Sequence, residues 1–220
     1  MSELKLLFQG DSLTDSGRDR SFAGCNKGLG NGYVNLIASR ILCDNPEVQI
    51  YNRGVAGNRI ADMYARWIED AENIPFNVIS IMNGVNDVGF KLREKRGADA
   101  NKFEFVYDRI LYETKESHPE CDIILCQPFV IKMIYEKEND IYEKWDVWSR
   151  EIIERGEVVR ALAKKYNVLF VEMIPEIEKA LKKAPAEHWT VDCIHLTPAG
   201  NELIARTWLD AAKPILDKYL

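Results

Sequence analysis

Five short, continuous apolar segments constrain this chain more than any other feature of its sequence. They are residues 4–8, 48–52, 78–82, 122–126 and 168–171. Between them lie stretches in which apolar residues recur at helical spacing. Continuously apolar strands are typical of parallel sheets buried on both faces, whereas half-exposed strands alternate apolar with polar residues. The order of elements therefore predicts an α/β fold of a single domain, residues 1–220, with three α/β/α layers around a five-stranded parallel sheet.

Apolar periodicity and turn residues predict where the helices lie. The expected helices are residues 33–42, 60–72, 103–116, 142–166, 175–183 and 198–220. Gly156 marks the point where the longest of them would bend. Four stretches have no clear periodicity and are expected to be irregular: residues 17–32, 91–101, 129–140 and 185–197. Because residues 91–101 are strongly charged, we interpret that segment as a solvated loop or lid.

Composition excludes several classes of function. The formal net charge of -6 disfavours a nucleic-acid partner. No apolar run reaches the ~20 residues needed to span a bilayer, and the first strand begins too close to Met1 for a signal peptide. We therefore expect a cytoplasmic protein without membrane contact. The five cysteines show neither paired spacing nor a metal-ligand pattern, so no disulfide framework and no metal site are predicted. The subunit count stays open, a homo-oligomer included.

The hexapeptide GDSLTD, residues 10–15, is the strongest functional signal in the chain. Ser12 follows a buried strand at the point where the chain turns into a helix, which is where open α/β sheets bind ligands. The unpaired N–H groups and positive dipole of a helix start favour an oxygen that becomes negatively charged. This position suits a nucleophilic serine. The alternative is structural, because Ser12 and Asp15 nearly form a capping box and Asp11 is itself a good N-cap.

Polar residues at the ends of other strands complete a possible catalytic site. In a parallel sheet, the loops after the strand ends lie on one side and can converge. His195 is the natural general base, because imidazole titrates near neutrality. Asp192, three residues earlier, would orient the imidazole and stabilise its charged form. The backbone N–H groups of Ser12 and Gly54 and the side-chain amide of Asn86 would donate to an oxyanion. The pattern indicates acyl transfer.

These residues also have structural interpretations. Gly54 and Gly57 are typical of turns that require positive φ. Asn86, with the aspartate after it, is typical of a strand-to-helix cap, and the aspartate–histidine pair is compatible with a surface contact. The chain has two other histidines, His118 and His188, which we interpret as structural or peripheral.

Four motifs occur in chain order, GDSLTD, GVAGN, GVND and DCIH. Together they resemble the SGNH (GDSL) hydrolases, whose four blocks supply serine, glycine, asparagine and histidine, and the resemblance covers essentially the whole chain. It implies a flavodoxin-like fold and a hydrolase that needs no metal or organic cofactor. It also implies Ser12 as nucleophile, Gly54 and Asn86 as oxyanion-hole donors, and Asp192 and His195 as the other triad members.

A narrower resemblance concerns the substrate. The stretches GLGNGYVNLI, NRGVAGN, ARWIED, SIMNGVNDV and DCIHLTPAGNELIA look like those of intracellular acetyl-xylooligosaccharide esterases. The histidine block of these esterases commonly carries an aromatic residue immediately before the aspartate, whereas this chain has Val191 there. That departure concerns the shape of the acyl pocket.

The resulting hypothesis is a serine esterase that removes O-acetyl groups from a small acylated carbohydrate. Asp11, Tyr33 and Trp189 are candidate substrate contacts. Flat aromatic rings suit sugar faces, although core packing is the alternative role for each aromatic residue. Rival enzymes on the same triad are a broad arylesterase, a thioesterase and a lysophospholipase. A non-catalytic carbohydrate-binding protein is the rival from another class, and a phosphate-binding protein is disfavoured because the loops lack a Walker pattern.

Overall fold

Five parallel strands form the centre of the fold in the computed structural model, which describes residues 3–22, 24–133 and 144–220. The strands are β1 (Lys5–Gly10), β2 (Gln49–Asn52), β3 (Val78–Met82), β4 (Asp122–Cys126) and β5 (Leu169–Val171). They lie in the order β2-β1-β3-β4-β5, and every neighbouring pair is parallel. The predicted parallel sheet is confirmed. The first, second and fifth strands each begin one residue later than expected, and the first ends two residues later.

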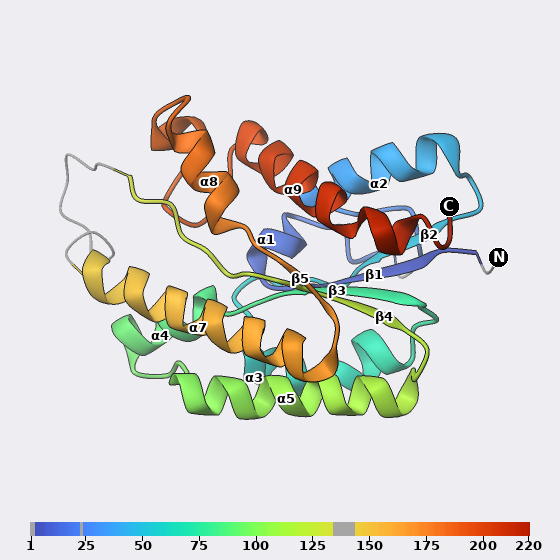
Figure 1. The fold of residues 1–220 in the computed structure, drawn as a ribbon, viewed down its shortest axis with the longest axis horizontal. Helices are drawn as coiled ribbons and strands as arrows, with labels where there is room; N and C mark the ends of the chain where they lie inside the picture. The colour runs from blue at the N-terminus through green and yellow to red at the C-terminus, as the bar shows by residue number, and fades with distance from the viewer. Residues whose placement is uncertain (1–2, 23, 134–143) are drawn as a thin grey trace.

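Helices cover both faces of the sheet (Figure 1). One face carries α2 (Tyr33–Asp44), α8 (Ile174–Leu181) and α9 (Pro198–Leu216). The opposite face carries α3 (Ile60–Ala65), α4 (Val85–Glu94), α5 (Ala100–Ser117) and α7 (Trp145–Tyr166). The short helix α1 (Ser12–Asp15) follows β1 directly, and a 3-10 turn, η2, spans Ala186–His188. This arrangement confirms the predicted three-layer α/β/α fold.

Alternation along β1 shows why both faces need a helical cover. The side chains of Leu6 and Phe8 lie in the core beneath α2 and α9, whereas Leu7 lies in the core beneath α3, α5 and α7. All three are fully buried. Burying such a side chain contributes about 1.5–3 kcal/mol, so a strand with apolar side chains on both faces is most stable between two layers.

The prediction for residues 91–101 is wrong, because no separate loop or lid spans this segment. Its first four residues complete α4, which the sequence analysis did not anticipate, and its last two begin α5. Helix α4 forms because Val85 and Val88 pack against Trp148 and Ile152 of α7 in a small apolar cluster. Only five residues, 95–99, connect the two helices.

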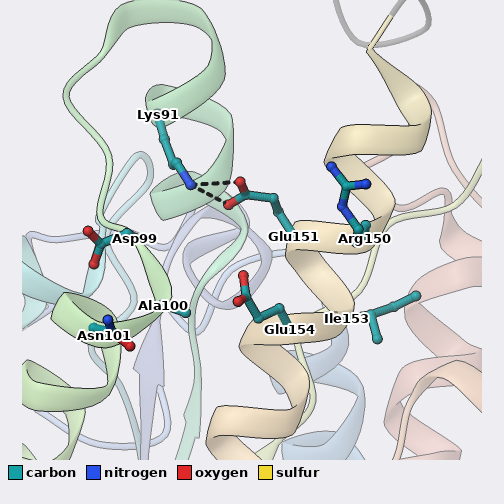
Figure 2. A pocket seen from close by; sticks show the side chains of 8 residues that line it. All are labelled: Lys91, Asp99, Ala100, Asn101, Arg150, Glu151, Ile153 and Glu154. Carbon is teal, nitrogen blue, oxygen red and sulfur yellow. Dashed lines mark hydrogen bonds and ion pairs between the residues drawn. The ribbon is translucent and has the colours of Figure 1, made fainter.

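The charged residues of this segment contact a neighbouring helix. Figure 2 shows the Lys91 ammonium between α4 and α7, with both carboxylate oxygens of Glu151 at 2.6 and 2.8 Å. The pair borders a surface cavity of about 590 Å³ between α4, α5 and α7, which is also lined by Asp99, Arg150 and Glu154. The ion pair therefore joins the C-terminal half of α4 to α7.

Other predicted helices differ in detail. The helix expected over residues 60–72 is divided into α3 and a π-helical turn, η1 (Ile68–Glu72). Gly156 lies inside the unbroken helix α7, where a Cβ would stand 3.3 Å from the side chain of Gln127. Residues 129–133 are irregular as expected, whereas 134–143, which include the first two residues of the long predicted helix, lie outside the described residues. Within the described ranges, every helix is too short or too polar to cross a bilayer.

Candidate active site

The turn from β1 into α1 presents Ser12 at the carboxyl edge of the sheet. Gly10 ends the strand, and a Cβ there would stand 2.3 Å from the Thr14 hydroxyl and 2.4 Å from the Met82 carbonyl oxygen. Asp11 is the N-cap of α1, and its Oδ1 accepts the Leu13 N–H at 3.0 Å. Ser12 is therefore the first helical residue, partly exposed, with its backbone N–H at the positive end of the helix.

A short turn before α9 presents Asp192 and His195. Its base is an antiparallel bridge between Thr190 and Leu196, and the Thr190 hydroxyl donates to the His195 carbonyl oxygen at 2.7 Å. Within the turn, Asp192 Oδ1 accepts the backbone N–H groups of Ile194 (3.0 Å) and His195 (2.7 Å). These bonds fix the aspartate against the chain that carries the histidine.

Three side chains form one hydrogen-bonded chain. His195 Nε2 lies 3.0 Å from Ser12 Oγ, and His195 Nδ1 lies 2.6 Å from Asp192 Oδ2. The serine and the histidine are 183 residues apart in sequence. With Nδ1 protonated toward Asp192, Nε2 is the free acceptor for the seryl proton. This geometry matches a nucleophile, a general base and the carboxylate that orients the base.

Local electrostatics favour a charged imidazole beside a carboxylate. The hydrogen bond to Asp192 is the main cause that raises the pKa of His195, against the effect of partial burial. Burial acts to raise the pKa of Asp192, but the hydrogen bonds from His195 and the backbone N–H groups outweigh it and lower that pKa. The pair therefore stabilises the imidazolium that forms when His195 takes a proton.

The structure corrects the expectation that Gly54 donates to an oxyanion. Its backbone N–H already donates a buried hydrogen bond to Asn52 Oδ1 at 2.9 Å. The position needs glycine for a different reason, because a Cβ would stand 2.4 Å from the Asp15 backbone nitrogen. Gly54 thus allows the loop after β2 to pack directly on α1.

Gly57 is the residue in this loop that fits the donor role. Its φ is +81°, and a Cβ would meet nothing within 4 Å, so it lies at an open position. In the described part of the chain, its backbone N–H has no hydrogen-bond partner. From the sequence, Gly57 is predicted only as a turn residue. The signal was present in its motif, which contains two glycines, but their spacing does not say which N–H is free.

Hydrogen bonds bring the segments that carry Gly57 and Asn86 toward the start of α1 and toward each other. The Val55 N–H donates to the Gly10 carbonyl oxygen at 3.0 Å, which places the loop after β2 beside the start of α1. The side-chain amide of Asn86 donates to the Asn58 carbonyl oxygen at 3.2 Å, which places Asn86 beside Gly57. The backbone N–H groups of Ser12 and Gly57 and the second amide hydrogen of Asn86 are therefore the candidate donors for an oxyanion.

Two of the three predicted substrate contacts are wrong. Tyr33 is fully buried, and its hydroxyl lies 2.9 Å from the Thr14 hydroxyl in the core. Asp11 is only 2% exposed and caps α1, so it cannot reach a sugar. Burial raises the pKa of Asp11 to about 6. Asp11 therefore acts as the N-cap of α1, which was the alternative role that the sequence also allowed.

Trp189 and the other two histidines lie outside the Ser12 site. Trp189 is half-buried, donates from Nε1 to the Ala184 carbonyl oxygen at 3.2 Å, and lines a pocket of about 290 Å³ between α8 and α9. None of the three hydrogen-bonded site residues lines that pocket. His188 packs edge-on against Trp189, and His118 stacks on Phe76. The role of Trp189 as a substrate contact therefore remains a prediction.

Comparisons with known proteins agree with this geometry. The family model described as the GDSL-like Lipase/Acylhydrolase family matches residues 8–203. An acetylxylan esterase from Geobacillus stearothermophilus is 31% identical over 212 residues, which cover 93% of this chain and 92% of that protein. Its crystal structure superposes with a TM-score of 0.83 over 96% of this chain and 94% of that one. A Parabacteroides merdae protein described as a GDSL-like lipase gives a TM-score of 0.88 at 32% identity, covering 96% of each chain.

Proposed function

The chain belongs to the GDSL-like lipase/acylhydrolase family and is a carboxylic ester hydrolase, and from this premise we propose that it removes O-acetyl groups from xylo-oligosaccharide-like esters through an acyl-enzyme on Ser12. The observation that carries the proposal is the chain of hydrogen bonds from Ser12 through His195 to Asp192, at 3.0 and 2.6 Å. A binding protein that only holds a carbohydrate has no use for this alignment.

The proposed reaction has two halves. His195 Nε2 takes the proton of Ser12 Oγ while Oγ bonds to the acetyl carbonyl carbon, and the carbonyl oxygen becomes an oxyanion. When the carbon–oxygen bond to the sugar breaks, His195 returns the proton to the sugar oxygen. Water then gives a proton to His195 and attacks the acetyl-serine. When the bond to Ser12 Oγ breaks, His195 returns that proton to Oγ and acetate is released. Asp192 stays ionised throughout and stabilises the imidazolium.

The N–H groups of Ser12 and Gly57 and the amide of Asn86 act on the two tetrahedral intermediates. Because these donors are fixed before the reaction, they stabilise the oxyanion without reorganising. The loss of one such donor typically costs about 10²–10³-fold in kcat.

The packing around Ile194 supports a short acyl group. Ile194 follows Asp192 by two residues and packs against the apolar cluster of Val85, Val88 and Trp148, next to Asn86. The Ile194 side chain therefore joins the histidine turn to the start of α4, where we expect it to limit the room for an acyl chain. An open groove would gain ~0.8 kcal/mol for each methylene group that a longer acyl chain buries, whereas filled space opposes it.

The resemblance to an acetylxylan esterase supports the carbohydrate part of the proposal. Val191, directly before Asp192, is 57% exposed, so the rim of the site on this side carries a small aliphatic residue. A broad arylesterase, a thioesterase and a lysophospholipase use the same triad and differ from the proposal in the acyl and alcohol groups they accept.

One experiment separates these functions. The rates on nitrophenyl esters with acyl chains of two to eight carbons are compared with acetate release from acetylated xylo-, chito- and cello-oligosaccharides, and Ser12→Ala serves as the matched blank. We expect kcat/KM to fall as the acyl chain lengthens and to be greatest for an acetylated xylo-oligosaccharide. A flat or rising acyl series would refute the acetyl preference, and nitrophenyl acetate hydrolysis without acetate release from any sugar would refute the carbohydrate substrate.

A further inference from the structure

Asp87 is a buried carboxylate that the proposed reaction does not use. Its side chain is fully buried, and its Oδ2 accepts the backbone N–H of Ile60 at 2.9 Å. Its Oδ1 is also buried and has no hydrogen-bond partner among the described residues. Burying a carboxyl group with an unpaired oxygen lowers the stability of the fold. Its presence therefore points to a role other than stability.

The position of the Asp87–Ile60 hydrogen bond suggests this role. Asp87 directly follows Asn86 near the start of α4, and Ile60 is the first residue of α3, three residues after Gly57. The hydrogen bond therefore joins the two segments that carry two of the three oxyanion donors. The other polar links between these segments are longer, since Asn83 and Asn86 each donate to the Asn58 carbonyl oxygen at 3.2 Å.

We propose that Asp87 is a positioning residue for the oxyanion hole, which holds the start of α3 against the start of α4 and so fixes the distance between Gly57 and Asn86. The opposite end of α4 is held separately by the Lys91–Glu151 ion pair (Figure 2). At the N-terminal end, where Asn86 lies, Asp87 adds a buried hydrogen bond to the apolar packing of Val85 and Val88. This inference rests on the proposed esterase function.

The contact can be broken from either side with matched variants. Asp87→Ala removes the acceptor, whereas Asp87→Asn keeps an oxygen that accepts the Ile60 N–H. Ile60→Pro removes the donor, and proline is tolerated at the first position of a helix. The extended backbone of Arg59, with φ -85° and ψ 173°, is also compatible with a following proline. Ile60→Ala shortens the same buried side chain but keeps the N–H.

The measurement is steady-state hydrolysis of nitrophenyl acetate, with thermal unfolding of each variant. We expect Asp87→Ala and Ile60→Pro to lower kcat by about 10- to 100-fold, less than the outright deletion of a donor, with KM within about twofold. Asp87→Asn and Ile60→Ala should keep kcat within about threefold. The double variant Asp87→Ala/Ile60→Pro should be no slower than the slower single variant, because both remove one contact.

A control variant separates positioning from general destabilisation. Gln127 has the same local role at α8, where its Oε1 accepts the N–H groups of Met173 and Ile174 at 3.0 and 3.1 Å. Gln127→Ala should lower the unfolding temperature while kcat stays within about threefold.

Each outcome decides the proposal. If Asp87→Ala and Ile60→Pro lose stability but keep wild-type kcat, or if Gln127→Ala loses kcat equally, Asp87 is merely structural. If Asp87→Ala does not fold, the comparison of Ile60→Pro with Ile60→Ala still decides. If the wild-type protein hydrolyses no ester, the proposed function has failed instead, and the two failures are distinguishable.

Discussion

Asp87→Asn should gain stability relative to wild type as the pH rises, and it should be the more stable of the two proteins at pH 8. Burial is the main cause that raises the pKa of Asp87 from 3.8 to about 7, and repulsion by Asp11 adds to it. The hydrogen bond from Ile60 and the charges of Arg155 and Arg59 oppose this shift without cancelling it. In the unfolded chain the carboxyl group returns to its ordinary pKa.

The sign follows from proton binding. Between about pH 4 and pH 7 the folded chain holds a proton on Asp87 that the unfolded chain has lost, so stability falls as the pH rises through this window. At 1.36 kcal/mol for each unit, the shift costs about 2 kcal/mol at pH 5 and about 4 kcal/mol at pH 8. Asparagine cannot ionise and removes this dependence, although its amide adds a buried donor that costs about 1–3 kcal/mol at every pH.

Urea unfolding of both proteins at pH 5 and pH 8 measures the effect. The free energy of unfolding of Asp87→Asn, relative to wild type, should be about 2–3 kcal/mol more favourable at pH 8 than at pH 5. Asp11, whose pKa is about 6, titrates in both proteins, so its contribution largely cancels in the comparison. A difference that is equal at the two pH values would refute the raised pKa of Asp87.

Four further predictions test the site. Ser12→Ala should lower kcat by ~10⁴-fold or more with an unchanged unfolding temperature; a variant that keeps more than a few per cent of the rate would exclude Ser12 as nucleophile. Asn86→Ala should lower kcat by about 10²–10³-fold with little change in KM, and a loss seen only in KM would make Asn86 a substrate contact. Because Asp192 raises the pKa of His195 and the base must be neutral, activity should fall as the pH drops through a value above 6.5. Asp192→Asn should move that limb to lower pH; an unmoved limb would assign it to another group. Gly57→Ala should lower kcat, because alanine disfavours φ +81°, whereas Gly54→Ala should mainly lower the unfolding temperature, since its Cβ would collide with Asp15; the reverse result would restore Gly54 as the donor.

The sequence was sufficient to predict the sheet and the group of Ser12, Asp192 and His195, for a physical reason. Strands with apolar side chains on both faces are typical of a doubly covered parallel sheet, and such a sheet brings the loops after its strands to one edge. Ser12 and His195, which are 183 positions apart, can therefore be predicted as neighbours from the order of strands and loops.

Helix α4 was not predictable in the same way. Gly84, with φ +133°, precedes the helix as its N-cap, and the helix itself contains Gly89 and ends in charged residues. Gly89 weakens the helix by roughly 1 kcal/mol relative to alanine, and the charged end lacks apolar periodicity. The helix forms because Val85 and Val88 pack against Trp148 on α7. This contact joins residues about 60 positions apart, so local helix propensity cannot predict it.

The choice between Gly54 and Gly57 required the structure for a deeper reason. A sequence shows where a glycine stands, but glycine is needed either where another chain approaches closely or where φ is positive. Gly54 meets the first need against α1, and Gly57 meets the second. Whether an N–H is available to an oxyanion depends on what else accepts it, and Asn52, two residues before Gly54, already accepts the Gly54 N–H. The catalytic use of a backbone donor is thus decided by the side chains that leave it unpaired, and only the folded chain shows which those are.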